Sequence, residues 1–296
     1  MAGNLIYLRR RIKSVKNTQK LTKAMKTVAA AKLRRATAEL KKTRPHRDKI
    51  SFLLQQTGAM IDLIRQPLLK IREQGSILLV VVASDKGLCG AFNSHVLKQS
   101  ENYYRELIDR GEAVSLFTVG TMASRYFLKR NLAVKKVHNG LINRLQFADA
   151  RSLAAELTDI YLNEEIKCVE FAFHEYVSAS RQPFIVRRLF PIAMEQFVPP
   201  DSKNEKDFEK TKYIFEPGAE AIFQALLPRS ITAAVYQILL QSMAAEQVSR
   251  MVAMDLATRN ASDMIRSLTL LLNKMRQASI TKELLEIITA TEALNK

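Results

Sequence analysis

The chain has little glycine, little cysteine and no tryptophan. Its 296 residues include 9 glycines and only two cysteines, Cys89 and Cys168, whereas average usage would give about 7% glycine. Two cysteines are too few for a disulfide framework and are typical of a reducing compartment. Scarce glycine beside abundant alanine, leucine, lysine and arginine predicts a helix-rich protein.

Long apolar runs are also missing. The longest purely apolar run covers residues 77–83, far short of the roughly 18 residues that a membrane-spanning helix needs. The first 20 residues carry too many charges for the apolar core of a signal peptide. We therefore expect a soluble, intracellular protein.

Acidic residues are scarce at the N-terminal end. The chain has a net charge of +17, and residues 1–49 hold 16 lysines and arginines against only Glu39 and Asp48. This segment therefore supplies +14 of the total, and the other 247 residues supply +3. A basic arm of this kind predicts an acidic partner.

Helix breakers leave two long stretches uninterrupted. Between Gly3 and Gly58 there is no glycine and the only proline is Pro45, and after Gly218 there is no glycine and the only proline is Pro228. At 1.5 Å rise per residue these stretches predict helices of about 80 and 110 Å, each kinked at its proline. Helices of this length need a partner along their length.

Apolar spacing supplies that partner. In the C-terminal stretch, small and apolar side chains recur alternately three and four residues apart, the heptad pattern of a coiled coil. Its members are Met251, Met254, Thr258, Ala261, Ile265, Leu268, Leu272 and Met275. A second such row runs from Leu5 to Leu40 through Leu8, Ile12, Val15, Gln19, Thr22 and Met25. Together they predict an intramolecular antiparallel coiled coil, the alternative being two amphipathic helices on an ordinary globular core.

Strands and helices alternate between the two long stretches. The pattern predicts a doubly wound, largely parallel, Rossmann-like α/β domain, so that the fold class is α+β overall, with the coiled coil as the second part. Expected strands cover residues 76–83, 113–119, 132–137, 168–178 and 184–189, and expected helices cover 92–110, 122–129 and 147–162. A charged linker is expected at 199–212. The predicted domains are 1–58 (N-terminal coiled-coil helix), 75–198 (α/β domain), 199–216 (linker and foot) and 217–296 (C-terminal coiled-coil helix).

Motifs for chemistry are mostly absent. There is no GxGxxG and no GxxxxGK[ST] phosphate loop, and the nearest sequence, residues 87–90 (GLCG), favours a strand-to-helix turn. Ser84 and Asp85 follow the first strand, but no base is linked to them by a motif, so we interpret them as turn caps. Cys89 is interpreted as a small buried residue and not as a nucleophile. The histidines have no metal-ligand spacing; they are His46, His95, His138 and His174. The sequence therefore predicts no catalytic residue, no cofactor and no metal site.

Nucleic acid is the alternative partner for the basic arm, because phosphates attract lysine and arginine. Tyr7 is the only aromatic residue within residues 1–49, however, and aromatic side chains are the usual stacking partners of bases. A helix partner is also required by the heptad row. A nucleic-acid-binding coiled coil remains the second interpretation, and a small-molecule enzyme with a site at residues 84–90 is the third.

Three stretches carry a family resemblance. Residues 9–36 (RRRIKSVKNTQKLTKAMKTVAAAKLRRA) resemble the N-terminal helix of the γ subunit of F-type ATP synthases. Residues 84–93 (SDKGLCGAFN) are similar to the mid-chain signature of that family, and residues 244–287 are similar to its C-terminal helix. The likeness spans essentially the whole chain and indicates the bacterial type.

The resemblance implies a rotor shaft. In this family the terminal helices form a coiled coil inside a ring of alternating α and β subunits, and the α/β domain rests on the c ring beside the ε subunit. The chain is then a non-catalytic part of the complex. It would couple ion-driven rotation of the c ring to ATP synthesis, peripherally at the cytoplasmic face of the bacterial plasma membrane.

The resemblance also implies residue roles. Arg276, Gln277 and Thr281 match positions that touch a β-subunit loop, and Met25 and Arg250 match rotor–stator contacts near an acidic β loop. The c-ring foot corresponds to Tyr213 and Glu216. The coiled-coil seam includes Ile12, Val15, Met254, Ile265, Leu268 and Leu272.

Overall fold

A computed structural model describes residues 2–197 and 215–294. The chain divides into two compact units, one of residues 1–30 and 250–296 and the other of residues 31–249. We name them the paired-helix unit and the sheet unit. The expected linker at 199–212 lies outside the described residues.

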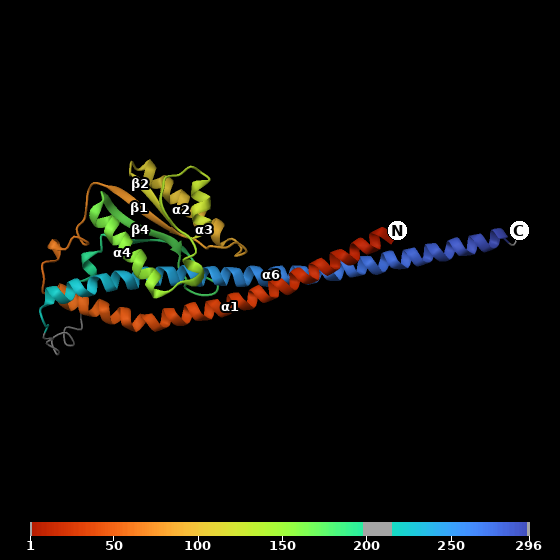
Figure 1. Ribbon diagram of the computed structural model, residues 1–296, viewed down its shortest axis with the longest axis horizontal. Helices are drawn as coiled ribbons and strands as arrows, with labels where there is room; N and C mark the ends of the chain where they lie inside the picture. The colour runs from red at the N-terminus through yellow and green to blue at the C-terminus, as the bar shows by residue number, and fades with distance from the viewer. Residues whose placement is uncertain (1, 198–214, 295–296) are drawn as a thin grey trace. The chain divides into compact units, whose positions relative to one another are not determined.

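Two long helices each contribute to both units. Helix α1 (Ala2–Gly58) has 57 residues and helix α6 (Ala219–Leu294) has 76. Figure 1 shows both as long helices that carry the two ends of the chain. Pro45 and Pro228 lie inside these helices and end neither of them. The scarcity of glycine therefore predicted both helices correctly. Neither they nor any other described helix is long and apolar enough to cross a membrane.

In the paired-helix unit the two helices run antiparallel. Three polar contacts between side chains fix this direction, because residue numbers rise along α1 as they fall along α6. The contacts are Gln19 Nε2 to Ser262 Oγ at 2.7 Å, Thr22 Oγ1 to Thr258 Oγ1 at 2.7 Å, and Lys26 Nζ to Asp255 Oδ1 at 2.5 Å. The predicted antiparallel coiled coil is thus confirmed.

Burial in the paired-helix unit follows the heptad rows. Leu8, Ala29, Met254 and Ala261 are buried. The remaining predicted seam residues are half-buried; these are Ile12, Val15, Ile265, Leu268 and Leu272. Large apolar residues outside the rows are solvent-exposed, as Leu270 is at 66%. The helix pair is therefore held together by a narrow seam, and the rest of each helix surface is exposed to solvent.

The sheet unit contains five strands in the order β3-β2-β1-β4-β5. The first four in the chain pair in parallel, and β5 is antiparallel to β4. Their bounds are β1 Ser76–Val82, β2 Val114–Val119, β3 Val134–His138, β4 Ile166–His174 and β5 Phe184–Phe190. The sheet is thus largely parallel, as the alternating pattern predicted.

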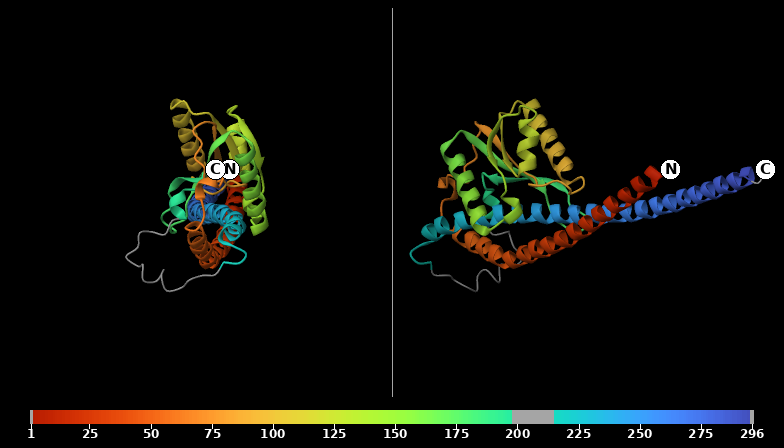
Figure 2. Two further views of the ribbon diagram at one scale, coloured as in Figure 1. Left: turned by 90° about the vertical axis from the view of Figure 1, so that its left-hand side faces the viewer. Right: turned by 45° about the vertical axis from the view of Figure 1, so that its right-hand side comes forward.

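Helices cover both faces of this sheet. Helices α2 (Phe92–Asp109) and α3 (Thr121–Leu128) share one core cluster with alternate residues of β1, and α4 (Phe147–Asn163) shares the other. Figure 2 shows α2 and α4 on opposite sides. Because both faces of β1 are buried, residues 77–83 form a continuous apolar run. Short 3-10 turns at Leu63–Arg65, Ile142–Arg144 and Met194–Gln196 complete the described elements.

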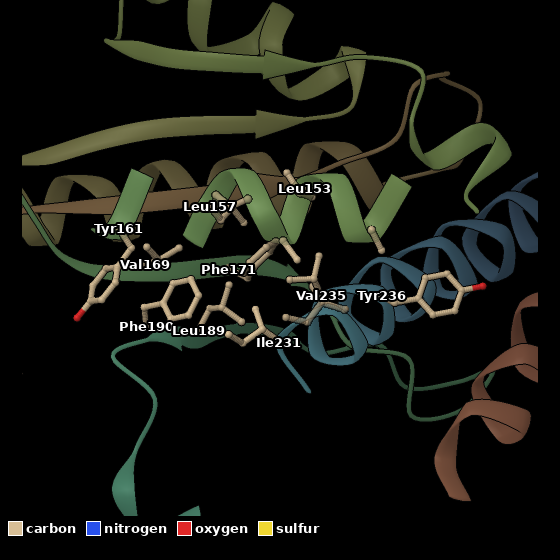
Figure 3. Packing of buried hydrophobic residues seen from close by; sticks show 14 of the residues in the cluster. Leu153, Leu157, Tyr161, Val169, Phe171, Leu189, Phe190, Ile231, Val235 and Tyr236 are labelled. Carbon is tan, nitrogen blue, oxygen red and sulfur yellow. The ribbon is translucent and has the colours of Figure 1, made fainter. Parts of the chain in front are cut away.

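The α4 face of the sheet packs against the inner parts of the terminal helices. Side chains of α4 meet those of β4, β5 and α6 in one cluster (Figure 3). Helix α6 contributes residues at four-residue intervals: Phe223, Leu227, Ile231, Val235 and Leu239. Each large side chain buried in this way stabilises the fold by about 1.5–3 kcal/mol. The sheet therefore has its core in common with α1 and α6.

Candidate functional site

The α6 arm, residues 276–294, begins beside the first turn of α1 and continues past its start. The register of the cross-helix contacts places Leu5 beside Met275 and Arg276. Every side chain of residues 280–291 is exposed. Exposed apolar side chains cluster there; they are Ile280, Leu284, Leu285, Ile287 and Ile288, each 45–63% exposed. Contiguous apolar surface of this kind marks an interaction site.

Three predicted contact residues lie at the base of the α6 arm. Arg276, Gln277 and Thr281 are all exposed. Their spacing on an α-helix places them within an arc of about 140°. They are therefore available together to one partner surface.

Met25 and Arg250 lie at the other end of the paired-helix unit. Both are half-buried, and Met25 belongs to the seam. The register places Met25 opposite Asp255 and Leu256, about 8 Å along the helix axis from Arg250. Arg276 lies about 30 Å further along α6 than Leu256, the position opposite Met25. The predicted contacts thus form two groups on one rod.

Electrostatics favour this helix pairing. The Asp255 carboxylate forms ion pairs with Lys26 at 2.5 Å and with Arg259 at 2.8 Å. The hydrogen bond from Lys26, aided by the charge of Arg259, lowers the pKa of the Asp255 carboxyl. Basic residues of α1 are therefore partly matched inside the pair, and most of them remain available outside it.

The expected foot is described only in part. Tyr213 lies outside the described residues, and Glu216 is exposed. Pro217, next in the chain, lines an open cleft of about 690 Å³ together with Met60, Arg65 and other residues from the segment that follows α1 and from the start of α6. Met60 is 65% exposed. This end of the sheet unit thus carries a hollowed surface with apolar and charged lining.

The carboxyl ends of the parallel strands are where α/β proteins usually bind ligands. Here Asp85 fills part of that edge. Its carboxylate accepts hydrogen bonds from the backbone N–H groups of Thr121 at 3.1 Å, Gly140 at 2.7 Å and Asn143 at 3.2 Å. Asp85 therefore ties the start of α3 and the loop after β3 to the end of β1, a wider role than the turn cap we predicted.

A second hydrogen-bond network at the same edge joins Ser84, Cys89 and Asn93. Asn93 Oδ1 accepts from the Ser84 N–H at 3.1 Å and lies 2.9 Å from the Ser84 hydroxyl, and Asn93 Nδ2 donates to Cys89 Sγ at 3.1 Å. Cys89 is buried beside Phe92 and Ala245. The signature at residues 84–93 thus builds the strand-to-helix turn before α2.

Within residues 2–197 and 215–294, no group of three or more His, Cys, Asp or Glu side chains is arranged to hold a metal ion. One pair of histidines that sequence spacing did not indicate, His95 and His174, does come together. The two histidines are 79 positions apart in the chain, so no local sequence pattern indicates that they meet.

Comparison with known proteins gives the family. A family model described as ATP synthase matches residues 4–294. The ATP synthase gamma chain of Anaeromyxobacter sp. (strain Fw109-5) is 41% identical, over 97% of this chain and 98% of that protein. The ATP synthase gamma chain of Pelotomaculum thermopropionicum is 39% identical over the same shares.

Solved structures agree. A chain in the central stalk and c-ring structure of the Tetrahymena thermophila mitochondrial ATP synthase is 26% identical. It matches with a TM-score of 0.59, over 80% of this chain and 99% of that one. A chain of the Euglena gracilis mitochondrial enzyme shares the fold with a TM-score of 0.68 at 17% identity, over 99% and 95% of the two chains. The chain therefore belongs to the ATP synthase gamma chain family, and it is a non-catalytic, central-stalk subunit of an F-type ATP synthase.

Proposed function

We propose that the chain is a shaft whose rotation, driven by ion flow through a c ring, imposes conformational change on catalytic β subunits. Its partners would be the α and β subunits, the ε subunit and the c ring. It would lie peripherally at the cytoplasmic face of a bacterial plasma membrane. Support comes from the gamma chain relatives and from the Tetrahymena structure, which contains a central stalk and a c ring.

One observation carries the proposal. The α6 arm exposes five large apolar side chains, and no described residue of the paired-helix unit covers them. A single helix of this kind is only marginally stable in water, so its apolar side chains need the surface of a partner to cover them. A ring of α and β subunits would provide that surface.

An asymmetric rod inside a pseudo-threefold ring meets each β subunit with a different face. The three catalytic sites would therefore be held in different states, and rotation would exchange them. Each ion that crosses contributes about 2.3 kcal/mol per 100 mV. Two long helices, each with a single internal proline, with no glycine in residues 219–294 and only Gly3 and the terminal Gly58 in α1, would transmit this work with little twist.

Residue roles follow from position. Arg276, Gln277 and Thr281 would hydrogen-bond a β-subunit loop near the base of the α6 arm. Met25 and Arg250 would form the second contact group, near an acidic β loop that suits the basic surface of residues 1–49. In this proposal residues 1–58 and 217–296 are the shaft, and residues 75–198 with the foot at 199–216 are the part toward the c ring. Tyr213 and Glu216 would make that foot's contacts.

The reconstituted complex tests these roles. We expect Arg276→Ala combined with Gln277→Ala to lower coupled ATP synthesis about tenfold, equivalent to about 1.4 kcal/mol. The matched control is Arg266→Ala, which removes an exposed arginine of the same helix from the part that α1 accompanies. Unchanged synthesis in the double variant would remove the proposed contact.

A further inference from the structure

His95 and His174 meet at the edge of the sheet unit where β4 ends. His95 Nδ1 lies 3.2 Å from His174 Nε2, and the two rings are 5.0 Å apart with planes inclined by 24°. His174 is the last residue of β4 and is 5% exposed, whereas His95 is exposed in the first turn of α2. Two imidazole nitrogens from separate elements therefore converge.

Hydrogen bonding fixes the tautomer of the buried ring. His174 Nδ1 is 2.9 Å from the carbonyl oxygen of Gln182, and a carbonyl can only accept, so Nδ1 carries the proton. Nε2 then presents a lone pair toward His95. A neutral imidazole whose far nitrogen donates to a backbone carbonyl is the arrangement that metal-ligating histidines adopt.

The spacing suits a shared cation. Two nitrogen ligands at about 2.0–2.1 Å from a tetrahedral ion lie about 3.3 Å apart, close to the observed 3.2 Å. A cleft of about 180 Å³ adjoins the pair and is lined by Ala91, Phe92, Gln182 and Ser249 as well as both rings. A water molecule occupies about 30 Å³ in the liquid, so the cleft has room for an ion and its remaining water ligands.

We propose that His95 and His174 form a two-histidine chelate for a borderline divalent transition metal ion such as Zn²⁺. Imidazole ligands favour zinc, copper and nickel over magnesium and calcium. With two protein ligands, and with the positive end of the α2 dipole nearby, the site binds more weakly than a three-ligand zinc site. A bound ion fastens the first turn of α2 to the end of β4.

The test is calorimetric titration of the full chain with Zn²⁺. His95→Gln is the principal variant, because this exposed side chain can be replaced without disturbing the core. The control is His46→Gln, which replaces an exposed histidine of helix α1. We expect one ion per unchanged chain, at least about tenfold weaker binding after His95→Gln, and unchanged binding after His46→Gln. His174→Gln, if circular dichroism shows it folded, weakens binding similarly.

Imidazole ¹⁵N resonances identify the ligands directly. In the unchanged chain Zn²⁺ should shift His95 Nδ1 and His174 Nε2 and leave His46 unmoved. The proposal is overturned if His95→Gln binds as tightly as the unchanged chain, or if no Zn²⁺ binds. It is equally overturned if the shifted nitrogens belong to His138, which is 2.8 Å from Glu156.

Discussion

Lys26 of α1 and Asp255 of α6 form an ion pair of 2.5 Å across the coiled-coil seam. The two residues are 229 positions apart in the chain. Thr22 and Thr258 meet one turn further along at 2.7 Å. Polar contacts inside an apolar seam specify register, because a shifted pairing would leave their groups unmatched. This ion pair therefore helps to fix how far α6 extends beyond α1.

Replacing Asp255 should weaken the helix pair. Lys26 lowers the pKa of Asp255, so its contribution to stability is present above the ordinary carboxyl pKa and is lost as pH falls through the lowered value. We expect Asp255→Asn to lower the Tm at neutral pH, and the difference to shrink in high salt. The control is Asp263→Asn, an exposed position. An equal change in both variants would contradict the role of this pair.

Replacing Asp85 should destabilise the sheet unit. Its carboxylate accepts three backbone hydrogen bonds from two other segments. Asp85→Ala leaves these N–H groups without their acceptor, which should lower the free energy of unfolding by about 3 kcal/mol. Urea denaturation measures the loss, with Asp109→Ala at the exposed end of α2 as control. A loss no larger than the control's would show that water replaces the carboxylate.

Glu101 predicts a specific acid sensitivity. The hydrogen bond from Tyr126 at 2.6 Å, with help from Arg105 and Arg130, lowers the pKa of this nearly buried carboxyl. A lowered folded-state pKa gives stability that is present above about pH 4.5 and is lost as pH falls through the folded value. We expect Glu101→Gln to reduce the free energy of unfolding at pH 7 by about 1–3 kcal/mol.

Two pH values separate this effect from a packing defect. If the carboxylate charge is responsible, the difference between Glu101→Gln and the unchanged chain should be large at pH 7 and should shrink as the pH falls through the lowered pKa of Glu101. A difference that stays constant between these values would mean that the glutamine is poorly accommodated. The measurement is guanidinium or urea unfolding at each pH.

Local patterns predicted the elements and the pairing of the two long helices, but not the other tertiary contacts. Missing glycine and the heptad spacing were sufficient for α1, α6 and their antiparallel pairing, and the strand–helix alternation was sufficient for the sheet. Asp85 bonds residues 36, 55 and 58 positions away, and no periodicity encodes such contacts. The shared core of α4 and α6 was likewise invisible, since amphipathic spacing shows which face is buried and not what covers it.

Neither the sequence patterns nor the fold of the isolated chain could identify the proposed contact residues. Arg276, Gln277 and Thr281 are exposed in the isolated chain, so their environment in a complex leaves no mark on this fold. Only the family resemblance singled them out. The apolar side chains of the α6 arm are different, because their exposure is itself a physical signal of a missing partner.

Leu285 and Leu239 should respond to truncation in opposite ways. Leu285, in the α6 arm, is 58% exposed, whereas Leu239 is fully buried against the sheet. Leu285→Ala should leave the Tm of the isolated chain nearly unchanged. If α and β subunits cover this side chain, it should weaken assembly or coupling by about 1–3 kcal/mol. Leu239→Ala should cost about 2–5 kcal/mol in the isolated chain. Thermal unfolding and coupled ATP synthesis separate the two. Normal coupling with Leu285→Ala would mean that this part of the arm stays in water within the complex.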